Sequence, residues 1–167
     1  PVSALNTNML KSSDFFTSAF PSEYGNANAG VFDLGFRKGN SDKREHMIQM
    51  GMLTGLEAMT EGPIKKGNGS SYLLAYRYSF TGLAQAMGLS VGTTATPFYQ
   101  DLSFKVTSGE SKLGRFTLFG LAGTSKIEFL HDKIDTTDLF ADPSANSYFT
   151  SDLAVVGLKH FIKVNDK

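Results

Sequence analysis

Four charged side chains are the strongest candidates for chemistry in this chain. They are Arg77, Asp101, Lys105 and Arg115. All four fall in segments where polar and apolar residues alternate, least cleanly around Arg115, so each is expected on the polar face of a β-strand. Charges on such a face form salt bridges, meet solvent or line a path for a polar ligand. We favour a solvated or salt-bridged wall over a ligand path.

The sequence offers little for catalysis or metal binding. His46, His131 and His160 share no ligand spacing, and the absence of cysteine excludes zinc thiolate sites and thiol nucleophiles. The aspartates within 132–142 do not follow the EF-hand order, which favours a solvated acidic loop over a calcium site. The glycines after Lys66 lack the rest of a phosphate-loop pattern, and no Gly-x-Ser-x-Gly elbow is present. We expect no enzyme, no cofactor and no metal.

Composition narrows the possible partners. The chain has 167 residues, of which 41% are hydrophobic, and its sixteen basic residues balance sixteen acidic ones. That balance argues against nucleic acid as a partner, because binding to phosphates favours a basic surface. The chain opens at Pro1 without a methionine or a signal sequence, so we expect it to be a piece of a longer protein.

β-Strands are the elements that would position the four charges. Ser71–Phe80 is the clearest strand, because its residues alternate between an aromatic-rich and a polar face. The aromatic stripe comprises Tyr72, Tyr76, Tyr78 and Phe80. After a break at Asn40–Arg44, six strands are expected, at about Glu45–Leu53, Leu56–Glu61, Ser70–Phe80, Phe98–Thr107, Leu113–Thr124 and Tyr148–Val164. The pattern predicts an all-β fold built as an antiparallel meander.

The residues before the break are expected to form short elements only. The stretch Asn6–Asn8 is a candidate cap for a short helical turn through Leu10. Short strands are predicted at Asp14–Ser18 and Val31–Lys38, joined by a loop rich in glycine and asparagine.

The connections between the six expected strands alternate in length. Gly62–Gly69 and Ser108–Lys112 are short, whereas Thr81–Pro97 and Ser125–Ser147 are long. This alternation is typical of outer-membrane β-barrels, whose strands need about 9–11 residues to cross the bilayer. In such a barrel the aromatic stripe faces lipid, which we favour over a sugar-stacking surface. The alternatives are a soluble all-β carbohydrate-binding module and a passive barrel or adhesin.

In Phe15–Asn40 a Tyr-Gly loop is followed by a run of small residues and by a strand that ends in a basic residue and glycine. This order resembles the plug of TonB-dependent outer-membrane receptors of the Bacteroidetes type. Phe15–Asn40 is similar to the end of that plug. The plug motif comprises Tyr24, Gly25, Asn26 and Gly30, followed by a strand that ends at Gly39.

Later segments resemble the same receptors. Glu61–Gly67 (EGPIKKG) is similar to their first periplasmic turn, Ser71–Phe80 to the strand that follows, and Pro97–Leu102 to the next descending strand. The resemblance covers nearly the whole chain but only part of a complete receptor, which has a plugged barrel of 22 strands in this family.

The resemblance implies a domain division and a location. Residues 1–40 would be the C-terminal part of a plug-like region, and residues 41–167 the first six or so antiparallel strands of a large plugged barrel in the bacterial outer membrane. Asp33 and Arg37 would then lock the plug to the charged lumen wall. The implied partners are the remainder of the barrel and plug, membrane lipid, a small nutrient ligand, and TonB through a segment outside this chain. The sequence does not identify the ligand.

Overall fold

The computed structural model describes residues 5–17, 21–25, 29–51, 55–79, 84, 87–88, 95–129 and 147–164. A 3-10 helix, η1, spans Thr7–Met9. The strands are β1 (Asp14–Phe16), β2 (Val31–Asp33), β3 (Glu45–Gly51), β4 (Gly55–Gly62), β5 (Ser71–Tyr78), β6 (Ala95–Thr107), β7 (Arg115–Phe129) and β8 (Ser147–Phe161). The predicted all-β class is therefore confirmed. Within these ranges no helix is long and apolar enough to cross a membrane.

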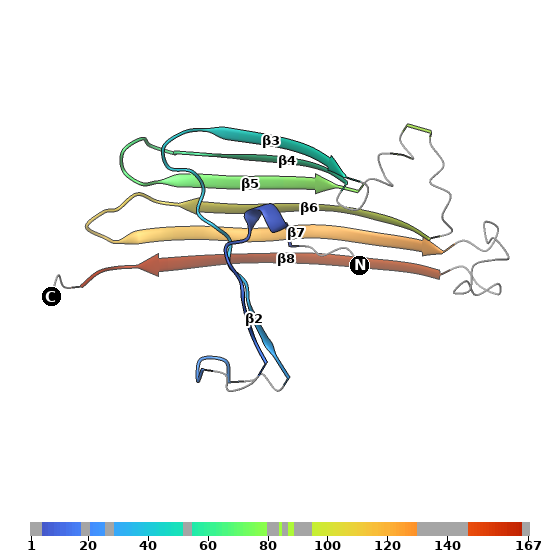
Figure 1. Ribbon diagram of the computed structural model, residues 1–167, viewed down its shortest axis with the longest axis horizontal. Coiled ribbons are helices and arrows are strands. Elements are labelled where there is room, and N and C mark those ends of the chain that lie inside the picture. The colour runs from blue at the N-terminus through green and yellow to red at the C-terminus, as the bar shows by residue number, and fades with distance from the viewer. Residues whose placement is uncertain are drawn as a thin grey trace.

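Strands β3 to β8 form one antiparallel sheet in which each strand pairs with the next in sequence (Figure 1). The turns at 63–70 and 108–114 lie at one end of this sheet, and the connections 52–54, 79–94 and 130–146 leave from the other. Pairing is continuous along the strands, for example from Ala95↔Phe129 to Thr107↔Thr117 between β6 and β7. The sheet is thus the expected meander.

Several strand ends differ from the sequence prediction. β5 ends at Tyr78, and Phe80 lies outside the described residues. β6 begins at Ala95 and includes Pro97, because β6 extends past the end of β5 there and a backbone without an N–H is tolerated on a free strand edge. The prediction that Ser125 begins a long loop is wrong, because β7 continues to Phe129 through backbone pairing that does not require apolar side chains.

The sheet has two chemically different faces. The register places even-numbered residues of β3–β8 on one face, here called the outer face, and odd-numbered residues on the inner face. Each strand exposes a large apolar side chain on the outer face: Ile48, Leu56, Leu74, Leu102, Leu118 and Val156. The inner face of β4–β6 instead contains buried charged and hydroxyl side chains.

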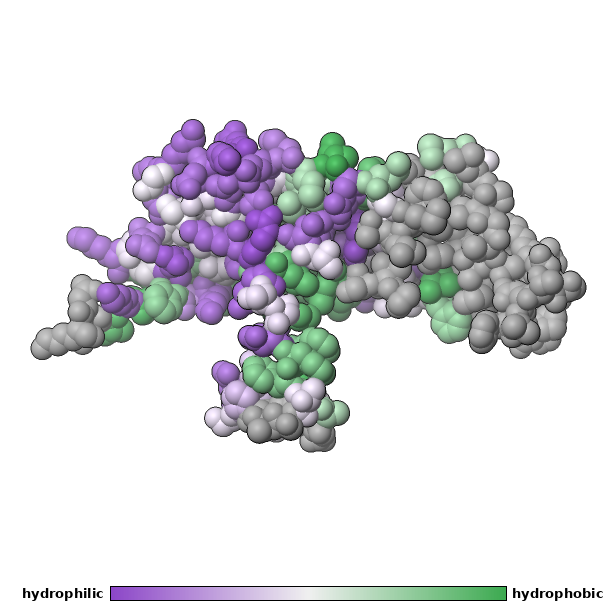
Figure 2. Space-filling model, viewed as in Figure 1, coloured by the Kyte–Doolittle hydropathy of each residue, from purple (hydrophilic) through white to green (hydrophobic). Residues whose placement is uncertain are grey.

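The N-terminal segment (residues 5–17 and 29–40) crosses the inner face, and its β1–β2 hairpin projects beyond the sheet (Figure 1). Within the predicted cap Asn6–Asn8, Asn6 is the capping residue, and its side chain accepts a hydrogen bond from the Asn8 backbone N–H. The strand expected over Val31–Lys38 is shorter, because only Val31–Asp33 pairs with β1 before the backbone turns onto the sheet. Figure 2 shows a hydrophobic group of atoms on the projecting hairpin, where Phe15 stacks on Phe32.

A small apolar core joins this segment to the sheet. Met9 packs against Leu73 and Ala75 of β5, and Phe36 and Met59 close the cluster. This core holds the N-terminal segment at the middle of the inner face and brings its polar groups to the buried charges.

Candidate functional site

The candidate site is the interface between the N-terminal segment and the inner face of β4, β5 and β6. Odd-numbered positions on these strands place Glu57, Glu61, Arg77, Asp101 and Lys105 on one surface. Buried charges are costly unless they are paired or hydrogen-bonded, so their partners determine what the interface does.

Arg37 joins the N-terminal segment to β4 through a two-pronged contact with Glu61. Its Nη1 and Nη2 donate to the two carboxylate oxygens of Glu61 at 2.8 and 2.6 Å. The Asn40 backbone N–H donates to the same carboxylate at 2.7 Å, and the Glu61 side chain is only 7% exposed. Hydrogen bonds with Glu61 raise the pKa of Arg37, so the guanidinium stays charged at any physiological pH.

Glu57, four residues before Glu61 on β4, accepts hydrogen bonds from the N-terminal segment and from β3. Asn6 and Asn8 of the N-terminal segment donate to its Oε1 at 2.7 and 2.9 Å. Gln49 of β3 donates to its Oε2 at 2.9 Å. Because Glu57 is 2% exposed, these amides replace the water that its carboxylate loses.

Arg77 and Asp101 form an ion pair within the wall itself. They lie opposite each other on β5 and β6, and both Nε and Nη2 of Arg77 donate to Asp101 Oδ2 at 2.8 Å. The side chains are 9% and 7% exposed, and the guanidinium also lies over the ring of Tyr99 at 5.5 Å. This pair links β5 to β6 within the inner wall.

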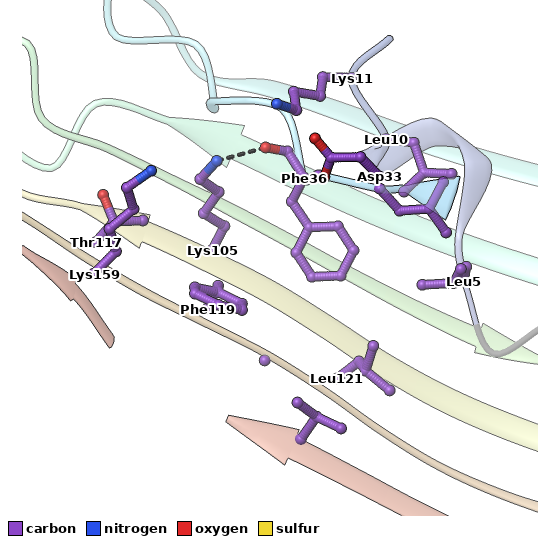
Figure 3. Close-up of a pocket in the computed structure, with 14 residues that line it drawn as sticks. Leu5, Leu10, Lys11, Asp33, Phe36, Lys105, Thr117, Phe119, Leu121 and Lys159 are labelled. Atoms are coloured by element: carbon purple, nitrogen blue, oxygen red, sulfur yellow. Dashed lines mark hydrogen bonds between the residues drawn. The ribbon is translucent and has the colours of Figure 1, made fainter. Parts of the chain in front are cut away.

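Lys105 of β6 makes a further link to the N-terminal segment. Its Nζ donates to the backbone carbonyl of Phe36 (Figure 3). Next to this link, Gly39 lies so close to β5 that a Cβ on it would stand 2.2 Å from the carbonyl oxygen of Tyr72. Only glycine permits this approach of one backbone to another.

Two candidates from the sequence lie elsewhere. Asp33 contacts no charged group of β4–β6; it hydrogen-bonds with Tyr24, whose pKa is raised by desolvation and by the nearby carboxylates of Asp33 and Glu23. Arg115 is at the first position of β7 and pairs with Glu110 in the turn before it. Arg115 is on the inner face as expected, at the end of the sheet where β7 begins. The Asp33 side chain hydrogen-bonds with Tyr24 of the same segment, so its predicted pairing with the charged wall is not observed.

The plug motif lies in and around the β1–β2 connection. Tyr24 packs against Phe16 with ring centroids 5.7 Å apart, and Gly25 is exposed. Gly30 faces Phe15, whose ring would lie 3.1 Å from an added Cβ. Asn26 lies outside the described residues.

Sequence reasoning missed Glu57, Glu61, Asn6 and Asn8 as members of the interface. A signal was present, since Glu57 and Glu61 are four residues apart and therefore fall on the same face of a predicted strand. The asparagines gave no such signal, because their role depends on where the segment crosses the sheet.

The described residues contain no group of three or more histidine, cysteine or acidic side chains that could hold a metal ion. The aspartates of 132–142 lie outside them. Comparisons with models of protein families, with curated proteins and with solved structures found no match to this chain. The geometry of the interface and of the two faces is therefore what bears on function.

Proposed function

We propose that this chain is part of a TonB-dependent outer-membrane receptor, with β3–β8 in the wall of its barrel and the N-terminal segment in its plug. The observation that supports this most strongly is the contrast between the two faces of one sheet. The outer face presents apolar side chains over six strands, while the inner face holds a polar, ion-paired segment.

The outer face has the chemistry of a surface in contact with lipid. Ile48 at one side of the sheet is 79% exposed, and Val156 at the other is 70% exposed. Monomeric soluble proteins rarely expose an apolar patch that spans a whole sheet. Transmembrane barrels alternate apolar residues outward with polar residues inward, and β4–β6 follow this alternation most closely.

The contacts between the N-terminal segment and the inner face are of a kind that would allow the segment to be released. Its links are charge-assisted hydrogen bonds and amide contacts around a core of few residues, which includes Met9 and Leu73. Polar contacts exchange with water more readily than a large apolar core does. In the proposed receptor, energy supplied through TonB would break these links to open a path for the nutrient.

A soluble carbohydrate-binding sandwich is the alternative. It requires a second sheet over the apolar outer face, and the only other sheet among the described residues is the β1–β2 pair of the N-terminal segment. On that face Tyr76 lies opposite Leu102 and beside Leu74, and its hydroxyl donates to Gln100 at 3.0 Å. The two aliphatic neighbours favour contact with lipid over stacking on a sugar.

Adjacent valines on β8 provide the test. Val155 points inward and is 46% exposed, and Val156 points outward and is 70% exposed. Because the chain lacks cysteine, Val155→Cys and Val156→Cys each give a single labelling site. With the protein reconstituted in liposomes, we expect brominated lipid to quench a bimane label at 156 strongly and at 155 weakly. Equal quenching at both positions, or none at either, would contradict the barrel.

Plug release has its own test in cells that express the protein containing this chain. Charge reversal Arg37→Glu places two carboxylates together at Glu61 and should loosen the plug. We expect increased entry of a large antibiotic that an intact outer membrane excludes, and Arg37→Glu with Glu61→Arg should restore the barrier. Unchanged permeability in the single variant would contradict the plug role.

A further inference from the structure

A pocket of about 450 Å³ lies between the N-terminal segment and the inner face of β6–β8 (Figure 3). That volume is in the range of sites for small molecules. One part of its lining is apolar and includes Leu5, Leu10, Phe36, Phe119, Leu121 and Val155. The other part is charged.

Three lysines from three separate elements line the charged part. Lys11 follows η1 and lies across Gly35, Lys105 belongs to β6, and Lys159 to β8. Asp33 is the acidic residue of the lining, and it already hydrogen-bonds with Tyr24. The pocket therefore has an excess of positive charge.

The arginines elsewhere on this interface, in contrast, have acidic partners. Arg37 is paired with Glu61, and Arg77 with Asp101. Among the described residues, none of the three pocket lysines forms an ion pair, and Lys105 donates to a neutral carbonyl. Lysines brought together without a counter-charge repel each other, and a bound anion would remove that repulsion.

We propose that this pocket binds a small apolar acid, with its carboxylate near the three lysines and its hydrocarbon part against Phe36, Phe119 and Leu121. A free inorganic anion fits less well, because it would leave the apolar half of the cavity without a partner. The inference does not depend on the proposed receptor. The quenching experiment at position 156 tests the receptor proposal, and the binding experiment tests the pocket. Either one can fail while the other succeeds.

The probe is 4-phenylbutyrate, with 4-phenylbutanol as its uncharged counterpart. Binding is measured by calorimetry on the purified protein in neutral detergent near pH 7, where the acid is ionised and lysines are charged. We expect saturable binding of the acid that the alcohol does not match. Lys11→Gln and Lys159→Gln, both at exposed positions, should each weaken binding by about threefold. Lys66→Gln, in the turn at 63–70, is the matched control and should have no effect.

Chemical protection locates the site independently of affinity. The acid should slow acetylation of Lys11, Lys105 and Lys159 by an amine-reactive ester, read out by mass spectrometry, and leave Lys66 unaffected. The proposal is overturned if the wild-type protein shows no saturable binding of the acid. This includes the case in which another part of the protein fills the pocket. It is also overturned if the alcohol binds equally well, or if Lys66 is protected to the same degree as the pocket lysines.

Discussion

The ring of Phe119 on β7 lies against Gly157, the residue directly opposite it on β8. A Cβ at Gly157 would stand 2.3 Å from Cζ of that ring. Phe104 and Gly120 repeat the arrangement on the outer face between β6 and β7, where the distance is 2.8 Å. An aromatic ring over a cross-strand glycine covers the exposed backbone and fixes the register of the pair.

Replacing Gly157 by alanine should therefore destabilise the sheet. The added methyl group must displace the Phe119 ring, and overpacking of this kind costs about 1–3 kcal/mol. Denaturant unfolding followed by circular dichroism measures the change. Gly157→Ala combined with Phe119→Leu should recover part of the loss, while Gly25→Ala, where an added Cβ meets nothing within 4 Å, is the control. An equal loss in the control would contradict the role of the ring.

Removing Arg37 should loosen the N-terminal segment without unfolding the sheet. Arg37→Ala leaves the Glu61 carboxylate buried without its cation, and the loss of a hydrogen bond to a charged group costs about 1.5–3 kcal/mol. We expect faster proteolysis after residues of the segment and unchanged proteolysis at β6–β8. The double variant Arg37→Ala with Glu61→Ala should be less affected than Arg37→Ala alone, because no unpaired carboxylate remains. Identical behaviour of the two variants would contradict the coupling.

Gly39→Ala tests the close approach of the segment to β5. The methyl group would overlap the backbone carbonyl of Tyr72, which cannot move aside as a flexible side chain can. We expect the hydrogen bond between Lys105 and Phe36 to be lost and the backbone amides of residues 36–40 to exchange with deuterium at least about tenfold faster, which corresponds to about 1.4 kcal/mol. Exchange rates equal to those of the wild type would show that the segment has room at this point.

An arginine introduced into the sheet should lower the stability of the protein strongly only where its side chain meets lipid. Leu74 lies in the middle of β5, and Leu113 lies in the turn before β7, so Leu74→Arg and Leu113→Arg introduce the same group at two depths. In liposomes, Leu74→Arg should lower stability by about 2–4 kcal/mol and Leu113→Arg by about 0–1 kcal/mol. Similar effects for the two substitutions would argue for an aqueous outer face.

Alternation along the chain was sufficient to predict the faces of the sheet but not its strand ends. Tyr72, Leu74 and Tyr76 fall on one face as expected, because period-two alternation is a local property. The end of β7 at Phe129 depends on backbone pairing with Ala95, which is a relation between distant residues. Because the residues near the end of β7 are polar, the strand was predicted to end before Phe129.

The interface was predictable only in part for the same reason. Arg77 and Asp101 could be placed on one polar face, yet their direct opposition depends on the register between β5 and β6, which alternation alone does not fix. Arg37 was expected to meet a charged wall, but its partner Glu61 could be identified only once the segment's path across β4 was known.

The path of the N-terminal segment also fixes an order of events during folding. Each strand of the sheet pairs with its neighbour in sequence, so hairpins can form as the chain lengthens. The contacts of the segment reach much further, over 51 residues from Asn6 to Glu57 and over 69 residues from Phe36 to Lys105. The segment is synthesised before the sheet, so Asn6, Asn8 and Arg37 must remain accessible to water or to a chaperone until β4 is in place. The carbonyl of Phe36 must wait longer, until β6 supplies Lys105.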